Sequence, residues 1–214
     1  MLEPMADFFA ARLEGYDEHM LAEVEGCREG YPLMASLLPK DIGRVLDLGC
    51  GTGLELDEIF KRFPSLAVTG IDLSDAMLNR LKEKHPQKNL TLICGDYFEV
   101  PFGEDFHAAL SFESLHHFTP EAKGELYRKL FRALTDGGVY LECDYMVDTQ
   151  AEQDLYFAEL ARMKKEQNLP EGYYHYDTPC TVETQISLLR QAGFSSVDRV
   201  FRKGGTCMLM AKKG

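Results

Sequence analysis

The most informative segment of this 214-residue chain reads Val45-Leu46-Asp47-Leu48-Gly49-Cys50-Gly51-Thr52-Gly53. A short apolar run ends in an acid, and a loop with glycine at every second position follows before a helical pattern begins. A second apolar run, Gly70-Ile71-Asp72, ends in an acid one helix length later. Because the carboxyl ends of parallel strands meet at one edge of an open α/β sheet, these loops and acids predict a ligand site there.

Strand-like apolar runs alternate with helical patterns along the chain, which indicates an α/β fold with helices on both faces of a parallel sheet. The Gly204-Gly205 pair separates the last two runs and is a hairpin signal, so we expect the last strand to be antiparallel. The seven expected strands are residues 44–48, 66–71, 90–94, 106–112, 138–143, 196–202 and 205–212.

Polar residues in front of the helical patterns predict where helices begin. We expect helices after Ser74, at Thr119-Pro120 and after Thr181, because Ser and Thr are favoured N-caps and Pro is favoured in the first turn. Another helix is expected to begin near Thr52, since Thr52 and Glu55 have the spacing of a capping box.

Two segments, residues 1–40 and 144–180, fall outside the alternation of strands and helices. The first has helical spacing, and the second combines a helix at about 150–167 with the aromatic run Tyr173-Tyr174-His175-Tyr176. Segments that fit no layer of the fold often cover a ligand crevice. We therefore expect residues 1–40 to form an N-terminal helical lid and residues 41–214 to form the main domain, with a lid insertion at 144–180.

Composition narrows the possible partners. The formal net charge of −12 argues against nucleic acid, which requires a surface that neutralises phosphates. No apolar run is long enough to span a membrane, and the acidic N-terminus lacks the pattern of a signal peptide. The six cysteines are scattered without a CxxC pair, so we expect reduced thiols, a cytoplasmic location and no metal site.

The residue types at the sheet edge suit a ligand that carries a ribose. Glycines let a ligand approach the backbone, and the helix that follows can receive a carboxylate as readily as a phosphate. Asp72 can accept both ribose hydroxyls, and Asp96, after the third strand, can accept from the amine of an adenine flanked by Tyr97 or Phe98. Helix capping and strand-end turns remain the alternative explanation for these residues.

The glycine spacing does not match two common nucleotide sites. A G-x-G-x-x-G fingerprint needs glycine where Leu54 stands, and the G-x-x-x-x-G-K-[ST] phosphate loop is absent. The chain instead resembles class I S-adenosylmethionine-dependent methyltransferases, most of all the bacterial small-molecule enzymes. The resemblance covers about residues 40–212. It is carried by motifs in the family's order, namely Val45–Gly53, Asp72, Gly95-Asp96, Ser111–Phe118 and Leu134–Tyr140.

This resemblance implies a Rossmann-like class I methyltransferase sheet and S-adenosylmethionine as the cofactor. It also implies a simple displacement, in which the protein aligns the acceptor and excludes water. The residues that the resemblance assigns to the cofactor site are Asp47, Gly49, Cys50, Gly51, Gly53, Asp72, Leu73, Met77, Gly95, Asp96, Tyr97 and Phe112.

The sequence names neither the acceptor nor a base. Candidate catalytic residues are Glu113 and His116, which follow the fourth strand, and His175 in the aromatic run. His117 instead resembles part of a structural turn. An aromatic pocket would suit a planar or cationic acceptor. The candidate acceptor contacts are Arg12, Tyr16, His116, Tyr145, Tyr174 and Tyr176.

The expected function is methyl transfer to a small-molecule acceptor by a monomer or homodimer. Two alternatives remain open: methylation of tRNA or a protein, and a non-catalytic module that binds S-adenosylmethionine and acts through a partner. The glycine spacing disfavours a nicotinamide-dependent oxidoreductase.

Overall fold

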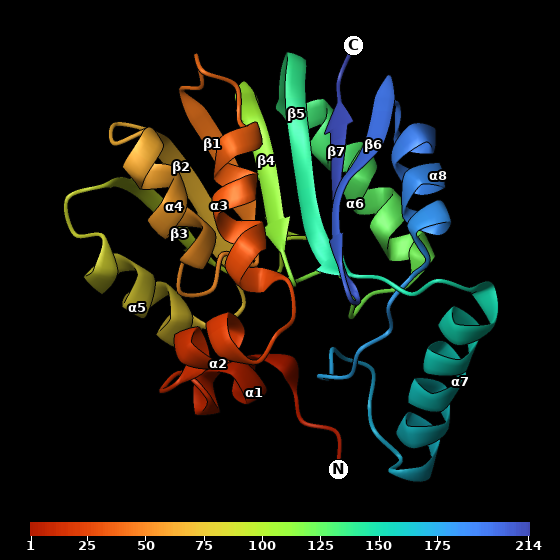
Figure 1. The fold of residues 1–214 in the computed structure, drawn as a ribbon. Helices are drawn as coiled ribbons and strands as arrows, with labels where there is room; N and C mark the ends of the chain where they lie inside the picture. The colour runs from red at the N-terminus through yellow and green to blue at the C-terminus, as the bar shows by residue number, and fades with distance from the viewer.

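The computed structural model describes all 214 residues and contains one seven-stranded sheet in the order β3-β2-β1-β4-β5-β7-β6 (Figure 1). Strand β7 pairs antiparallel with both β5 and β6, as the hairpin signal predicted, and the other pairs of neighbouring strands are parallel. The strands are β1 (Arg44–Leu48), β2 (Ala67–Asp72), β3 (Asn89–Cys94), β4 (Phe106–Phe112), β5 (Leu134–Tyr145), β6 (Ser196–Lys203) and β7 (Thr206–Lys212). The predicted fold class is therefore confirmed.

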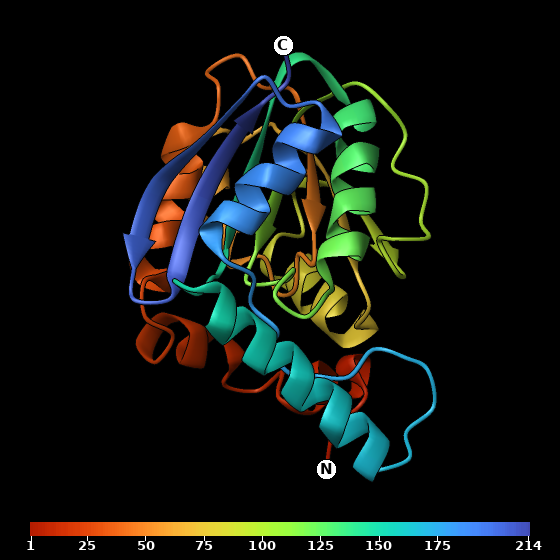
Figure 2. The ribbon, with the colours of Figure 1, turned by 90° about the vertical axis from the view of Figure 1, so that its right-hand side faces the viewer.

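Helices cover both faces of the sheet, with α3 and α4 on one side and α6 and α8 on the other (Figure 2). The helices are α1 (Met5–Ala11), α2 (Tyr16–Ala22), α3 (Cys27–Leu37), α4 (Leu54–Arg62), α5 (Asp75–Lys84), α6 (Pro120–Ala133), α7 (Gln150–Glu166) and α8 (Val182–Ala192). None of them is long and apolar enough to cross a membrane.

Strand β1 shows why the sheet is buried on both sides. Successive side chains of a strand point to opposite faces. Val45 accordingly packs in the core beneath α3 and α4, whereas Leu46 and Leu48 pack in the core beneath α6 and α8. A continuous apolar run is therefore typical of a central parallel strand, and it fixes the register of the loop that follows.

The predicted helix caps are present at three positions. The side chains of Ser74, Thr119 and Thr181 each accept a backbone N–H three residues ahead, and such caps stabilise a helix by about 1 kcal/mol each.

The predicted cap at Thr52 is wrong. Helix α4 begins two residues later, at Leu54, after Gly53 in a left-handed conformation with φ of 76°. The left-handed glycines carry the loop past Thr52 before the helix can start. The Thr52 hydroxyl instead donates to Asp17 of α2.

The segments outside the alternation lie at the carboxyl ends of the parallel strands. Helices α1 and α2 lie below those ends, and α7 lies on the same side of the molecule (Figures 1 and 2). Helix α3 differs, because it packs against α4 as part of the helix layer. Backbone hydrogen bonds join the N-terminus to the insertion: Met5 donates to Tyr173, and His175 donates to Glu3.

Candidate active site

The glycine-rich loop after β1 is tied to the end of β2 through one carboxylate. Asp72 accepts the backbone N–H of Gly51 at 2.9 Å and that of Ser74 at 2.8 Å, one on each oxygen. A carboxylate oxygen has two acceptor positions, so Asp72 keeps acceptor capacity for a ligand. Burial raises the pKa of Asp72, and the two N–H donors oppose that rise.

A cleft beside this loop collects residues from the N-terminus, the glycine loop and the ends of β2 and β4. Seven predicted cofactor residues line it, namely Gly49, Gly51, Asp72, Leu73, Met77, Tyr97 and Phe112. A smaller adjoining cavity is lined by Cys50 and Gly53. We call the two together the cofactor cleft.

Three predicted cofactor residues do not line the cofactor cleft. Asp47 lies buried beneath the glycine loop, and Gly95 packs closely on Val100. Asp96 accepts the backbone N–H of Phe98 at 2.8 Å, so its carboxylate stabilises its own turn.

Two neighbouring buried carboxyl groups beside the glycine loop have oxygens that no donor satisfies. Neither oxygen of Asp47 accepts a hydrogen bond, and neither does Oε1 of Glu55, which lines the smaller cavity. Burial raises the pKa of Asp47 to about 7, although interaction with the Glu55 side chain opposes that rise. Burial and the Asp47 charge raise the pKa of Glu55. Orphaned acceptors of this kind suit a cationic donor.

We expect Asp47→Asn to stabilise the ligand-free protein at pH 8. A carboxyl whose pKa is raised in the folded state destabilises the fold as pH rises from about 4 to about 7, and a change from 3.8 to about 7 corresponds to about 4 kcal/mol at most. Urea unfolding should therefore give the variant a higher free energy of unfolding than the wild type at pH 8, and no gain at pH 4. An equal difference at both pH values would contradict the buried charge.

A second cavity, of about 390 Å³, lies next to the cofactor cleft and is here called the acceptor cavity. Four residues line both spaces: Phe9, Tyr16, Glu113 and His117. The remaining lining residues are Phe8, His19, Met20, Val24, Glu25, His116, Tyr145, His175, Asp177, Gly205 and Thr206. Helices α1 and α2, the end of β4 and the insertion thus enclose one chamber beside the other.

His116 is the centre of a charged cluster in the acceptor cavity. Its Nδ1 donates to Oδ1 of Asp144, at the end of β5, over 2.6 Å, and its Nε2 lies 3.5 Å from Oδ1 of Asp177. Burial opposes the charged imidazolium, but Asp144, Asp177 and Glu113 outweigh it and raise the pKa of His116 to about 10. The ring is therefore a cation at neutral pH.

Glu113 occupies the boundary between the two chambers. The residue has a positive φ of 46°, and its N–H donates to the Cys143 carbonyl, which fixes the turn after β4. Its Oε1 accepts from the Thr206 hydroxyl at 3.0 Å, and burial raises its pKa to about 7. The Glu113 backbone is thus held in a strained conformation, and its buried carboxyl lies between the two cavities, where it can contact ligands in both.

A protein-family profile described as a methyltransferase domain matches residues 45–138, from β1 to the start of the apolar part of β5. The chain belongs to the class I S-adenosylmethionine-dependent methyltransferases. The match spans the glycine loop, Asp72 and Glu113, which are among the residues that line the cofactor cleft.

Individual relatives of this methyltransferase are distant. It is 27% identical over 210 residues to a carboxy-S-adenosyl-L-methionine synthase of Nitratiruptor sp., covering 87% of this chain and 84% of that protein. It is 33% identical to an uncharacterized methyltransferase of Staphylococcus carnosus, covering 63% of this chain and 64% of that protein.

Solved structures support the same fold. DesVI of Streptomyces venezuelae is 18% identical, with a TM-score of 0.69 over 94% of this chain and 98% of that chain. The chain spans only 55% to 62% of the length of some other methyltransferase structures that it matches.

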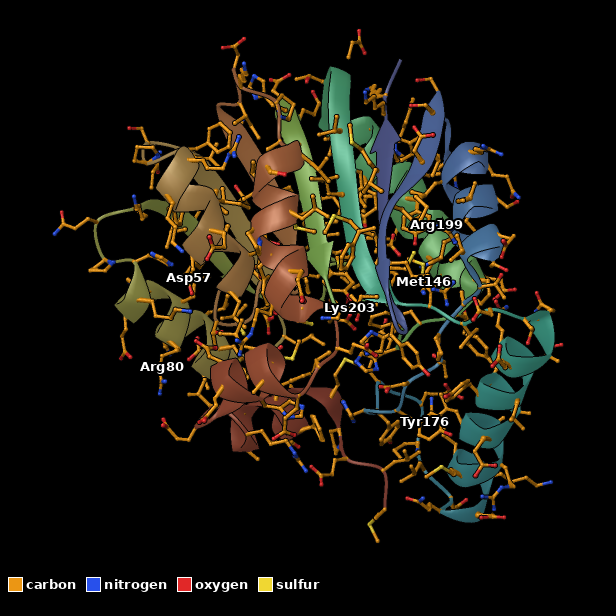
Figure 3. All side chains as sticks on the ribbon, viewed as in Figure 1. Asp57, Arg80, Met146, Tyr176, Arg199 and Lys203 are labelled. Atoms are coloured by element: carbon orange, nitrogen blue, oxygen red, sulfur yellow. The ribbon has the colours of Figure 1, made fainter.

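Not every acceptor contact predicted from the sequence lines the acceptor cavity. Arg12 does not line the acceptor cavity, because its guanidinium pairs with Glu3 and lies over the Phe8 ring. Tyr174 donates to the Pro170 carbonyl and lies outside the cavity, and Tyr176 contributes its carbonyl to His117 rather than its ring to the cavity. Figure 3 places Tyr176 between the N-terminal helices and α7.

Four residues named from the sequence line the acceptor cavity: Tyr16, Tyr145, His116 and His175. Polar lining residues from distant segments were not predicted. The most important of these is Asp177, which comes directly after the aromatic run. His117 holds Tyr176 as a structural residue would, yet it also lines both chambers. The missed residues are His19, Glu25, Asp177 and Thr206.

Proposed function

We propose that this enzyme transfers the methyl group of S-adenosylmethionine to a small-molecule acceptor bound in the acceptor cavity. The observation that carries the proposal is the shared boundary of Phe9, Tyr16, Glu113 and His117 between the two chambers. Ligands that occupy neighbouring chambers meet at such a boundary, and alignment of two reactants is the main contribution that this reaction needs from a protein.

The residues of the cofactor cleft fit S-adenosylmethionine. Asp72 has spare acceptor positions for the ribose hydroxyls, and the unpartnered Oε1 of Glu55, which lines the smaller cavity, suits the ammonium of the amino-acid tail. Gly49 and Gly51 keep the loop free of side chains where the ligand would lie. When bound, the cofactor supplies an activated sulfonium methyl group, and the other reactant must come from the acceptor cavity.

Glu113 and His116 are the side chains that we assign to the acceptor. Glu113 lines both chambers and can take a proton from an acceptor hydroxyl or amine, while its hydrogen bond with Thr206 holds the carboxylate in place. His116 is held by Asp144 and lines the acceptor cavity only. His175 stacks on Phe8 with ring centroids 3.4 Å apart, so we assign it to the cavity wall rather than to catalysis.

The N-terminal helices and the insertion 144–180 are proposed to act as the lid. Helix α2 is fastened to the cofactor side of the molecule, because Asp17 bonds Thr52 of the glycine loop and pairs with Lys84 of α5. Arg80 of α5, labelled in Figure 3, pairs with Glu14 of the loop between α1 and α2. Exclusion of water by this cover would prevent wasteful transfer to solvent. The six unpaired cysteines agree with a cytoplasmic location, and the charge of −12 agrees with a small-molecule acceptor.

Incubation with S-adenosylmethionine carrying an isotopically labelled methyl group, together with a metabolite extract, tests this proposal. Mass spectrometry should detect one labelled small molecule that is absent with the Asp72→Asn variant, which should fail to bind the cofactor. Label found only in tRNA or protein would contradict the small-molecule acceptor. Tight cofactor binding without transfer to any fraction would instead support a non-catalytic module.

A further inference from the structure

The acceptor cavity concentrates imidazole side chains. Four of the six histidines of the chain line it: His19, His116, His117 and His175. His116 and His117 face the carboxylate of Asp177, and one ligand atom from each of these three residues lies within 4.8 Å of the other two. We propose that His116, His117 and Asp177 bind a divalent transition-metal ion.

The separations within this triad are those of ligands around a common ion. Nε2 of His116 lies 3.5 Å from Oδ1 of Asp177, and Nδ1 of His117 lies 3.7 Å from the same oxygen. These distances are too long for good hydrogen bonds. Two ligands that bind one ion at about 2.1 Å in a tetrahedral arrangement lie about 3.4 Å apart. The three groups thus surround a shared point without satisfying one another.

A buried carboxylate orients the central ligand. Asp144 accepts from Nδ1 of His116 at 2.6 Å and is itself fully buried, so Nδ1 keeps its hydrogen, and Nε2, which faces Asp177, is the nitrogen that an ion would bind in place of a proton. Histidines that bind metal usually donate their other ring nitrogen to a carboxylate or carbonyl in this way. The Asp144–His116 pair therefore has the arrangement expected around a metal ligand.

The segments that carry the triad are locked together before any ion binds. The backbone N–H and the hydroxyl of Thr178 both donate to the His116 carbonyl, over 2.6 and 3.0 Å. Nδ1 of His117 faces the Tyr176 carbonyl at 3.2 Å, and an ion would replace that single hydrogen bond. Asp177 lies between Tyr176 and Thr178 in the chain, so its position relative to both imidazoles is fixed.

Two imidazoles and one carboxylate favour zinc or another first-row transition metal over magnesium or calcium. With three protein ligands, further coordination positions remain open to the acceptor cavity that all three residues line. The role of the ion in catalysis rests on the proposed function. The bound ion would hold an acceptor through its hydroxyl oxygen and lower the pKa of that hydroxyl. We expected no metal site because the cysteines lack a CxxC pair. The ligands proposed here include no cysteine, and they are two adjacent histidines and an aspartate in the distant insertion.

Titration of tag-free, chelator-treated protein with Co²⁺, without S-adenosylmethionine or acceptor, tests the site. We expect visible absorption bands that saturate at one ion per chain, with micromolar or tighter affinity, and competition by Zn²⁺. Asp177→Asn and His116→Ala should each weaken binding at least about 100-fold, and Asp144→Asn should weaken it about 10- to 100-fold. His19→Asn is the matched control, because it removes an imidazole from the same cavity outside the triad, and its affinity should equal that of the wild type.

Absence of saturable Co²⁺ and Zn²⁺ binding to the wild type would overturn the proposal, as would equal binding by Asp177→Asn. The side chain of Asp177 is 43% exposed, so its substitution is compatible with folding, which circular dichroism would verify. Methyl transfer plays no part in this titration. A missing metal site would therefore leave the proposed methyl transfer standing, and an inactive enzyme would leave the metal site standing.

Discussion

Asp72→Asn is expected to weaken binding of S-adenosylhomocysteine at least about 100-fold in isothermal titration calorimetry. Two charge-assisted hydrogen bonds to ribose hydroxyls contribute about 3 kcal/mol or more together. The amide of asparagine has one acceptor oxygen, and the backbone N–H groups of Gly51 and Ser74 already require both carboxylate oxygens. Replacement therefore removes the ribose contacts and loosens the loop at once.

Asp75→Asn is the matched control for this experiment. Asp75 lies three residues away at the exposed start of α5, and its carboxylate bonds only Asn79. Loss of its charge should leave affinity within about twofold, since exposed charges contribute little. Similar affinities for Asp72→Asn and the wild type would show that the ribose does not bind at the end of β2.

Gly49→Ala is expected to abolish cofactor binding and to lower the melting temperature. Gly49 has φ of 67°, and a Cβ there would lie 2.1 Å from Oγ and 2.7 Å from Cβ of Ser114. The left-handed conformation costs about 1–2 kcal/mol for alanine, and overpacking adds about 1–3 kcal/mol. Relief requires movement of the loop after β4, and that loop lines the cofactor cleft.

Gly103→Ala separates backbone strain from this clash. Gly103 has φ of 80°, but no atom lies within 4 Å of the point that an alanine methyl group would occupy. Gly103→Ala should therefore lose only the cost of the left-handed conformation, about 1–2 kcal/mol, and should bind the cofactor as tightly as the wild type. Ser114→Gly should partly restore Gly49→Ala, because it removes the atoms that the new methyl meets. Equal melting temperatures for Gly49→Ala and Gly103→Ala would contradict the close approach of the two loops.

The strands, the glycine loop and the end of β2 were predictable because their determinants are local. Successive apolar residues of β1 pack into the two hydrophobic cores on opposite faces of the sheet. Ser74 caps the helix that follows Asp72. Once parallel strands are recognised, their carboxyl ends must share one edge. The meeting of Asp72 with the Gly51 N–H then follows from topology rather than from the identity of distant residues.

The acceptor cavity was predictable only in part because its walls come from segments that no periodicity places. Arg12 was expected at the substrate but pairs with Glu3, which lies nearby on the same segment. Asp177 was overlooked because nothing in its local sequence indicates that Thr178 ties it to His116. Such contacts depend on how the insertion crosses the sheet edge, and that path is set by packing rather than by local propensity.

A crystal structure of the enzyme with S-adenosylhomocysteine tests the central claim most directly. We predict that both ribose hydroxyls lie within hydrogen-bonding distance of Asp72 and that the amino-acid tail lies along Gly49 and Gly51. The sulfur should face the boundary of Glu113 and His117, on the side of the acceptor cavity. A nucleoside bound away from Asp72, or a sulfur facing away from that boundary, would contradict the account.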